Sequence, residues 1–133
     1  MAFDDQLPAI AAERTVTATQ TPDVSSTGAD LVRKAIGDRY FSGVTGQGVG
    51  IALIDSGVSQ NHRGVKRRVI YVRDFVDPGG DGDDEYGHGT HVAGILVGTG
   101  EDSRDYFDQA PFSGMAPGAQ IISLRVLDGQ GIG

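Results

Sequence analysis

Three apolar stretches of the chain are rich in β-branched residues and are bounded by glycine or proline. They cover Val49–Ile54, Arg68–Val76 and, after the turn at Pro117–Gly118, Gln120–Leu127. Runs of this length and composition predict strands. The first is almost wholly apolar, which is typical of a strand buried on both faces of a parallel sheet.

Two further segments have the length and spacing of short helices. One begins after Thr27 and ends at Gly37, and the other covers His88–Val97. Helices that alternate with strands predict an α/β protein with an open, wound, mainly parallel sheet and flanking helices. Within the second strand a period of two places Val69 and Tyr71 on one face.

Composition narrows the classes of protein. The formal net charge of -7 argues against nucleic acid as the main partner, because phosphate binding needs a positive surface. No apolar run approaches the ~18–20 residues of a membrane-spanning helix, and no signal peptide is visible. The lack of cysteine excludes disulfides, thiolate catalysis and cysteine-bound zinc. Residues 1–26 have no clear period and predict an extended lead-in, so the folded domain is expected over residues 27–133.

Asp55 follows the first predicted strand directly and begins the sequence Asp-Ser-Gly. The carboxylate is therefore expected at the carboxyl end of the sheet, where open α/β sheets carry ligands and catalytic groups. Asp-Ser-Gly is also ordinary turn chemistry, so this position alone indicates either a turn or a functional carboxylate.

His88 begins the second predicted helix, where the helix dipole favours the neutral imidazole that a general base needs. Asp55 is the obvious carboxylate to hold its other ring nitrogen. His91, one turn later, is expected to be a buried structural histidine. An alternative makes the two histidines a metal pair on one helix face, but no His-Glu-x-x-His pattern supplies a further ligand.

Three motifs in order carry a resemblance to a known family. The segments Val49–Gly57 and His88–Gly94 closely resemble the aspartate and histidine motifs of the subtilisin-like serine proteases. The segment Gly114–Ala119, Gly-Met-Ala-Pro-Gly-Ala, and the strand Ile121–Leu127 are similar to the family's Gly-x-Ala-Pro turn and the strand after it. The resemblance covers residues 27–133 and implies the first part of a subtilisin-like fold.

The resemblance assigns roles residue by residue. It makes Asp55 the orienting carboxylate and His88 the general base and acid of a serine-type endopeptidase. It makes Leu127 part of an apolar subsite, and it gives Gly129, Gln130 and Gly131 the role of an extended edge that pairs with a polypeptide substrate. It also implies an extracellular protein without an organic cofactor.

The family's nucleophile motif, Gly-Thr-Ser-Met-Ala, does not occur in the 133 residues. Ser113 lies in the Ala-Pro turn region, and the one asparagine, Asn61, precedes His88, whereas the family's oxyanion asparagine follows the histidine. We therefore expect a fragment that is inactive alone and is completed by a C-terminal part of the same domain. The alternative is a non-catalytic peptide- or calcium-binding module derived from a protease.

Two further expectations concern ions and processing. Residues 77–85 hold many acids on a turn-rich loop, which suits calcium, and relatives often bind calcium near here. The expected ligands are Asp81, Asp83 and Asp84, although the loop is not an EF-hand because Tyr86 stands where that pattern needs glycine. Glu13–Ala18 resembles the end of a propeptide, which predicts that the lead-in includes a propeptide tail.

Overall fold

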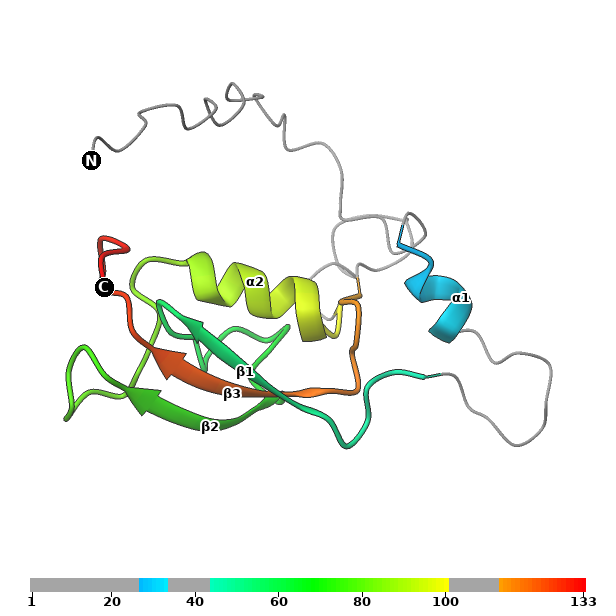
Figure 1. The fold of residues 1–133 in the computed structure, drawn as a ribbon, viewed down its shortest axis with the longest axis horizontal. Coiled ribbons are helices and arrows are strands. Elements are labelled where there is room, and N and C mark those ends of the chain that lie inside the picture. The colour runs from blue at the N-terminus through cyan, green and yellow to red at the C-terminus, as the bar shows by residue number, and fades with distance from the viewer. Residues whose placement is uncertain (1–26, 34–43, 101–112) are drawn as a thin grey trace, which may run out of the picture.

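The centre of the computed structural model is a sheet of three parallel strands, and the structure describes residues 27–33, 44–100 and 113–133 (Figure 1). The elements are α1 (Ala29–Arg33), β1 (Gly50–Asp55), β2 (Val69–Asp74), α2 (His88–Val97) and β3 (Gln120–Arg125). The predicted lead-in, residues 1–26, lies outside the described residues, as does the end predicted for the first helix.

β3 lies between β1 and β2, although it comes last in the chain. Its residues pair in register with β1 from Gly50 opposite Gln120 to Asp55 opposite Arg125. Both pairings are parallel, so the carboxyl ends of the three strands meet at one edge of the sheet. The predicted parallel α/β architecture is confirmed.

Helix α2 packs across one face of this sheet. Its residues Gly89, Ala93 and Val97 are buried, and their spacing of four places them on one side of the helix. Small side chains here let the helix lie close to the strands. The buried hydrophobic residues form one core beneath α2: Leu53, Val58, Val65, Ala93, Val97, Ala119 and Ile121.

The opposite face of the sheet is open over the described residues. Ile54 is 63% exposed and Tyr71 is 52% exposed. The prediction that residues 49–54 are buried on both faces is therefore wrong, because only α2 among the described elements covers the sheet. The prediction that Val69 and Tyr71 share a face is also wrong. A bulge between them pairs Val69 with buried Ile121 and Tyr71 with the next residue of β3.

The Gly-Met-Ala-Pro turn closes the end of α2. The amide N–H groups of Met115 and Ala116 donate to the carbonyl oxygens of Ile95 and Leu96 at 2.8 and 2.7 Å. These carbonyls belong to the last turn of α2, where carbonyl groups have no N–H donor inside the helix. The turn therefore caps the carboxyl end of α2, and the chain then continues into β3.

Helix α1 is short and is attached to the same region. The guanidinium of Arg33 donates to the carbonyl oxygen of Gly114 at 3.1 Å and to Ser113 Oγ at 3.0 Å.

Within the described ranges, no helix has the length and apolar character needed to cross a membrane.

Ser123, in the middle of β3, is fully buried, and its Oγ has no hydrogen-bond partner among the described residues. A buried hydroxyl without a partner loses its hydration and gains nothing in return. We predict that Ser123→Ala stabilises the protein by about 1 kcal/mol and raises Tm by a few degrees in a thermal melt. A lower Tm in Ser123→Ala would mean that the hydroxyl has a stabilising partner.

Candidate active site

Asp55 ends β1, and the backbone around it fixes the direction of its carboxylate. The N–H of Ser56 donates to Asp55 Oδ1 at 2.7 Å, and the N–H groups of Val126 and Leu127 donate to the Asp55 carbonyl oxygen at 2.8 and 3.2 Å. Burial alone would raise the pKa of Asp55, but the hydrogen bonds from His88 and Ser56 outweigh it and hold this pKa below its ordinary value.

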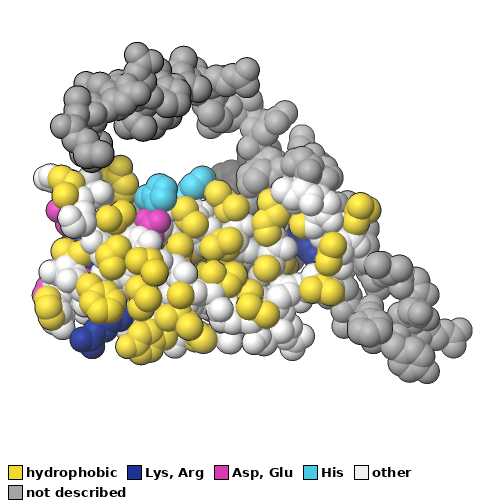
Figure 2. All heavy atoms as spheres, viewed as in Figure 1, with side chains coloured by type: hydrophobic (Ala, Val, Ile, Leu, Met, Phe, Trp, Pro, Cys, Tyr) yellow, Lys and Arg dark blue, Asp and Glu magenta, His cyan; other side chains and the backbone are white. Residues whose placement is uncertain are grey.

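The imidazole of His88 meets this carboxylate at the start of α2. Its Nδ1 lies 2.8 Å from Asp55 Oδ1 and 2.9 Å from Asp55 Oδ2. Because a carboxylate only accepts hydrogen bonds, this contact assigns the proton to Nδ1 and leaves Nε2 as an acceptor. The His88 side chain is 56% exposed. On the face drawn in Figure 2, histidine side chains lie at the surface beside an acidic side chain.

Glycine allows the two turns that carry these residues to approach each other. A Cβ at Gly89 would collide with the carbonyl oxygen of Gly57 and would lie 3.3 Å from the Cβ of Asp55. The N–H of Gly89 donates to Ser56 Oγ at 3.0 Å. A larger residue at position 89 would therefore push the first turn of α2 away from the end of β1.

Asp84 holds the segment just before α2. Its Oδ1 accepts from Ser56 Oγ at 2.8 Å and from the Gly87 N–H at 2.7 Å, and its Oδ2 accepts from the Thr90 N–H at 2.7 Å. Burial alone would raise the pKa of Asp84, but the hydrogen bonds from Thr90, Ser56 and Gly87 outweigh it and lower this pKa. The sequence analysis missed this role, which an acidic residue just before a predicted helix can indicate.

The predicted calcium ligands do not converge. Asp81 Oδ1 accepts from the N–H of Asp83 at 3.0 Å, and both oxygens of Asp84 are used within the protein. The buried Asp83 Oδ1 has no hydrogen-bond partner, but no group of three His, Asp or Glu side chains suited to a metal exists within the described ranges. Calcium needs about six to eight oxygen ligands, so the loop would have to rearrange to hold the ion, and calcium binding here stays a prediction.

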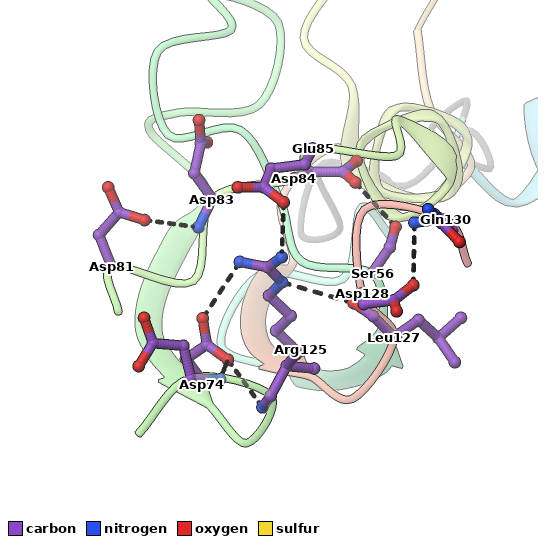
Figure 3. A network of polar contacts seen from close by, with 12 residues as sticks. Ser56, Asp74, Asp81, Asp83, Asp84, Glu85, Arg125, Leu127, Asp128 and Gln130 are labelled. Carbon is purple, nitrogen blue, oxygen red and sulfur yellow. Dashed lines mark hydrogen bonds and ion pairs between the residues drawn. The ribbon is translucent and has the colours of Figure 1, made fainter. Parts of the chain in front are cut away.

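Arg125 is a buried cation at the end of β3, surrounded by acidic side chains (Figure 3). It donates to Asp74 Oδ2 at 3.2 Å, to Glu85 Oε2 at 3.0 Å and to the Leu127 carbonyl oxygen at 3.4 Å. Burial alone would raise the pKa of Asp74, but the amides that follow it and the Arg125 guanidinium lower it. The charge of Arg125 is thus balanced inside the protein, and Glu85 is tied to the sheet.

The predicted substrate edge, Leu127 with Gly129–Gly131, is a turn. Asp128 Oδ1 accepts from the N–H groups of Gln130 and Ile132 at 2.8 and 3.0 Å, and the Gly131 N–H donates to the Asp128 carbonyl oxygen at 3.0 Å. The extended conformation that we predicted is therefore wrong, because an aspartate that bonds the amides after it closes the chain into a turn. A role of these residues in substrate binding stays a prediction.

The edge segment packs against the residues that precede His88. A Cβ at Gly129 would lie 2.8 Å from Glu85 Oε2, and a Cβ at Gly131 would lie 2.8 Å from the ring of Tyr86. A side chain at Gly129 would displace the end of Glu85, and one at Gly131 would meet the Tyr86 ring, so the edge segment lies against the two residues numbered 85 and 86.

His91 is exposed, so the prediction that it is buried is wrong. Helix α2 directs Gly89, Ala93 and Val97 at the sheet, and His91 lies outside this buried stripe. The metal-pair alternative gains no support, because no further His, Asp or Glu side chain completes a metal site with the two histidines within the described ranges. Asn61, which follows β1, is exposed.

Comparison with known proteins identifies the family to which the chain belongs. The model of the subtilase family matches residues 46–133. The chain belongs to the subtilase family. The resemblance inferred from the three sequence motifs is thereby confirmed, and the matched residues include all three strands and α2.

Individual relatives agree with this assignment. Thermitase of Thermoactinomyces vulgaris is 39% identical over 88 residues, which are 66% of this chain and 29% of thermitase. The intracellular serine protease of Paenibacillus polymyxa is 37% identical over 93 residues, covering 66% of this chain and 26% of that protein. The crystal structure of MycP1 with its N-terminal propeptide removed is similar with a TM-score of 0.50 and 31% identity, over 80% of this chain and 29% of that one.

This subtilase chain thus spans less than a third of the length of these relatives. Because one relative is named as an intracellular protease, membership of the family does not place the protein outside the cell. The extracellular location stays a prediction.

Three of the carboxyl groups with a lowered pKa generate a prediction about acid stability. Asp55, Asp74 and Asp84 have folded-state pKa values below the ordinary 3.8, so each stabilises the fold fully above pH 3.8 and loses that contribution as pH falls through its folded value. We expect the free energy of unfolding, measured with urea, to fall as the pH is lowered below about 4. The fall should be shallower in Asp84→Asn than in Asp77→Asn, whose carboxyl is exposed.

Proposed function

We propose that this chain supplies the aspartate and the histidine of a serine endopeptidase. The observation that carries the proposal is the hydrogen bond of 2.8 Å between Asp55, the last residue of β1, and His88, the first residue of α2. Membership of the subtilase family supports it, because the matched relatives include proteins named as serine proteases.

In this proposal Asp55 keeps the Nδ1 proton of His88 in place and stabilises the imidazolium once it forms. The free Nε2 accepts the proton of a serine hydroxyl as that oxygen attacks the peptide carbonyl, and it then donates this proton to the leaving amine. The substrate is a polypeptide. Exposure of the His88 side chain is consistent with a reacting hydroxyl that reaches it from outside the described residues.

Ser113 is not suited to be that nucleophile. The residue after it, Gly114, bonds to the carbonyl oxygen of Gly98, just beyond the carboxyl end of α2, whereas His88 begins the helix. A helix of 10 residues is about 15 Å long, so Ser113 lies far beyond hydrogen-bond reach of His88. Its Oγ also accepts from Arg33. The proposal therefore requires a nucleophile other than Ser113, and within the described residues none bonds to His88.

The alternative of a non-catalytic binding module has less support. The acidic loop does not gather its carboxylates, and amides of Gln130 and Gly131 bond within their own turn. A peptide strand would have to open this turn before it could pair there, and calcium would have to rearrange the loop.

We predict that the 133-residue chain hydrolyses no peptide and does not react with a serine-directed fluorophosphonate probe. Among the described residues no serine hydroxyl bonds to the His88 imidazole, whose hydrogen-bond partner is Asp55, so we expect none to be activated. Mass spectrometry of the probe-treated chain measures this directly. Labelling of Ser113 or of another serine would show that the chain has a complete site.

In the full-length protein we predict that Asp55→Asn lowers kcat by roughly 10⁴-fold while the fold is kept, because the asparagine no longer holds the productive tautomer of His88. Steady-state kinetics and near-ultraviolet circular dichroism measure the two effects. Asp77→Asn is the matched control, since Asp77 is exposed and lies outside the site. Full activity of Asp55→Asn would remove the proposed function.

A further inference from the structure

We propose that Ser56 and Asp84 form a clasp that positions the Asp55–His88 pair for catalysis. Both are positioning residues in this inference, and neither contacts the substrate. The inference rests on the proposed function and goes beyond it by assigning roles to two residues outside the reacting pair.

The hydroxyl of Ser56 joins the two turns. It donates its proton to Asp84 Oδ1 at 2.8 Å and accepts the N–H of Gly89 at 3.0 Å. Ser56 follows Asp55 in the chain, and Gly89 follows His88. A single buried oxygen, in a residue that is 1% exposed, therefore connects the neighbours of both members of the pair.

The carboxylate of Asp84 fixes the backbone on both sides of His88. It accepts the N–H of Gly87, the residue before the histidine, and the N–H of Thr90, two residues after it, each at 2.7 Å. Bonds from amides to an ionised carboxylate are among the stronger hydrogen bonds in proteins. Thr90 Oγ1 in turn accepts the N–H of Ser59 at 2.9 Å, which adds a second link to the segment after β1.

This arrangement differs from an ordinary helix cap. The N-cap residue of α2 is Gly87, which offers no side chain, so Asp84 bonds the amides of the first turn from three residues earlier. An ordinary cap would satisfy those amides without contacting β1. Asp84 does both, because one of its oxygens also receives the Ser56 hydroxyl.

The pair needs such support because packing does not hold the imidazole. His88 is 56% exposed, and its one described ring neighbour, Tyr86, lies 6.5 Å away between centroids. The position of the ring is therefore set by the backbone of residue 88 and by its bond to Asp55. Catalytic groups must be held within about 0.5 Å, and a shift of about 1 Å can lower the rate about 10²-fold.

The test uses the full-length protein with Ser56→Ala, Asp84→Asn and the double variant. We expect each single variant to lower kcat about 10- to 100-fold with little change in KM, because the clasp does not touch the substrate. We also expect the low-field proton NMR signal of His88 Nδ1–H to broaden or shift. The kcat of the double variant should be about equal to that of the less active single variant, because the two residues act as one unit.

Ser123→Ala is the matched control. It also removes a buried serine hydroxyl, but one that has no hydrogen-bond partner in the part of the chain that the structure describes, so kcat and the NMR signal should not change. Near-ultraviolet circular dichroism shows which variants keep the native fold. If Ser56→Ala does not fold, Asp84→Asn, which keeps one acceptor oxygen, provides the test.

Two results would overturn the clasp. One is native kcat and an unchanged His88 signal in folded Ser56→Ala and Asp84→Asn. The other is fully additive losses in the double variant, which would mean that the residues act separately. Failure of the proposed function has a different signature: Asp55→Asn would then keep its activity, while the NMR signal would still report whether the clasp holds the Asp55–His88 bond.

Discussion

The bond between Asp55 and His88 depends on the close approach of a strand end to a helix start. The backbone sets this approach, because any residue at position 89 other than glycine would place its Cβ against the carbonyl oxygen of Gly57. The two residues are 33 positions apart in the chain, so the bond exists only when β1 and α2 are both in place. The reactivity proposed for His88 is thus a property of the sheet and helix together.

Two neighbouring acidic residues, Asp84 and Glu85, connect the segment before His88 to different strands. Asp84 bonds to Ser56 and to the first turn of α2, whereas Glu85 bonds to Arg125 at the end of β3. The segment before the histidine is therefore tied to β1 through one side chain and to β3 through the next. Composition alone shows a run of acids that would ordinarily be solvent-exposed, and Asp77, Asp81 and Glu85 are exposed, but Asp84 accepts hydrogen bonds within the protein.

Local patterns predicted the elements well and the long-range contacts poorly. The bounds of α2 agree with the predicted His88–Val97, because small residues at a spacing of four identify its buried side. Asp55 and His88 stood out through motifs that occupy a strand end and a helix start. The bond between Ser56 and Asp84 joins residues 28 positions apart, and no local pattern encodes it. The turn at Asp128 was missed because the family motif outweighed the preference of aspartate for turns.

The strand order explains why the predicted substrate edge and the Asp55–His88 pair lie together. β3 enters the sheet between β1 and β2, so the chain that leaves β3 passes directly beside Asp55. The N–H groups of Val126 and Leu127 bond to the Asp55 carbonyl oxygen, which sets where the edge segment begins. Arg125, one residue earlier, holds Glu85 against the same segment. A displacement of β3 would therefore move the carboxylate, the approach to the histidine and the edge segment at once.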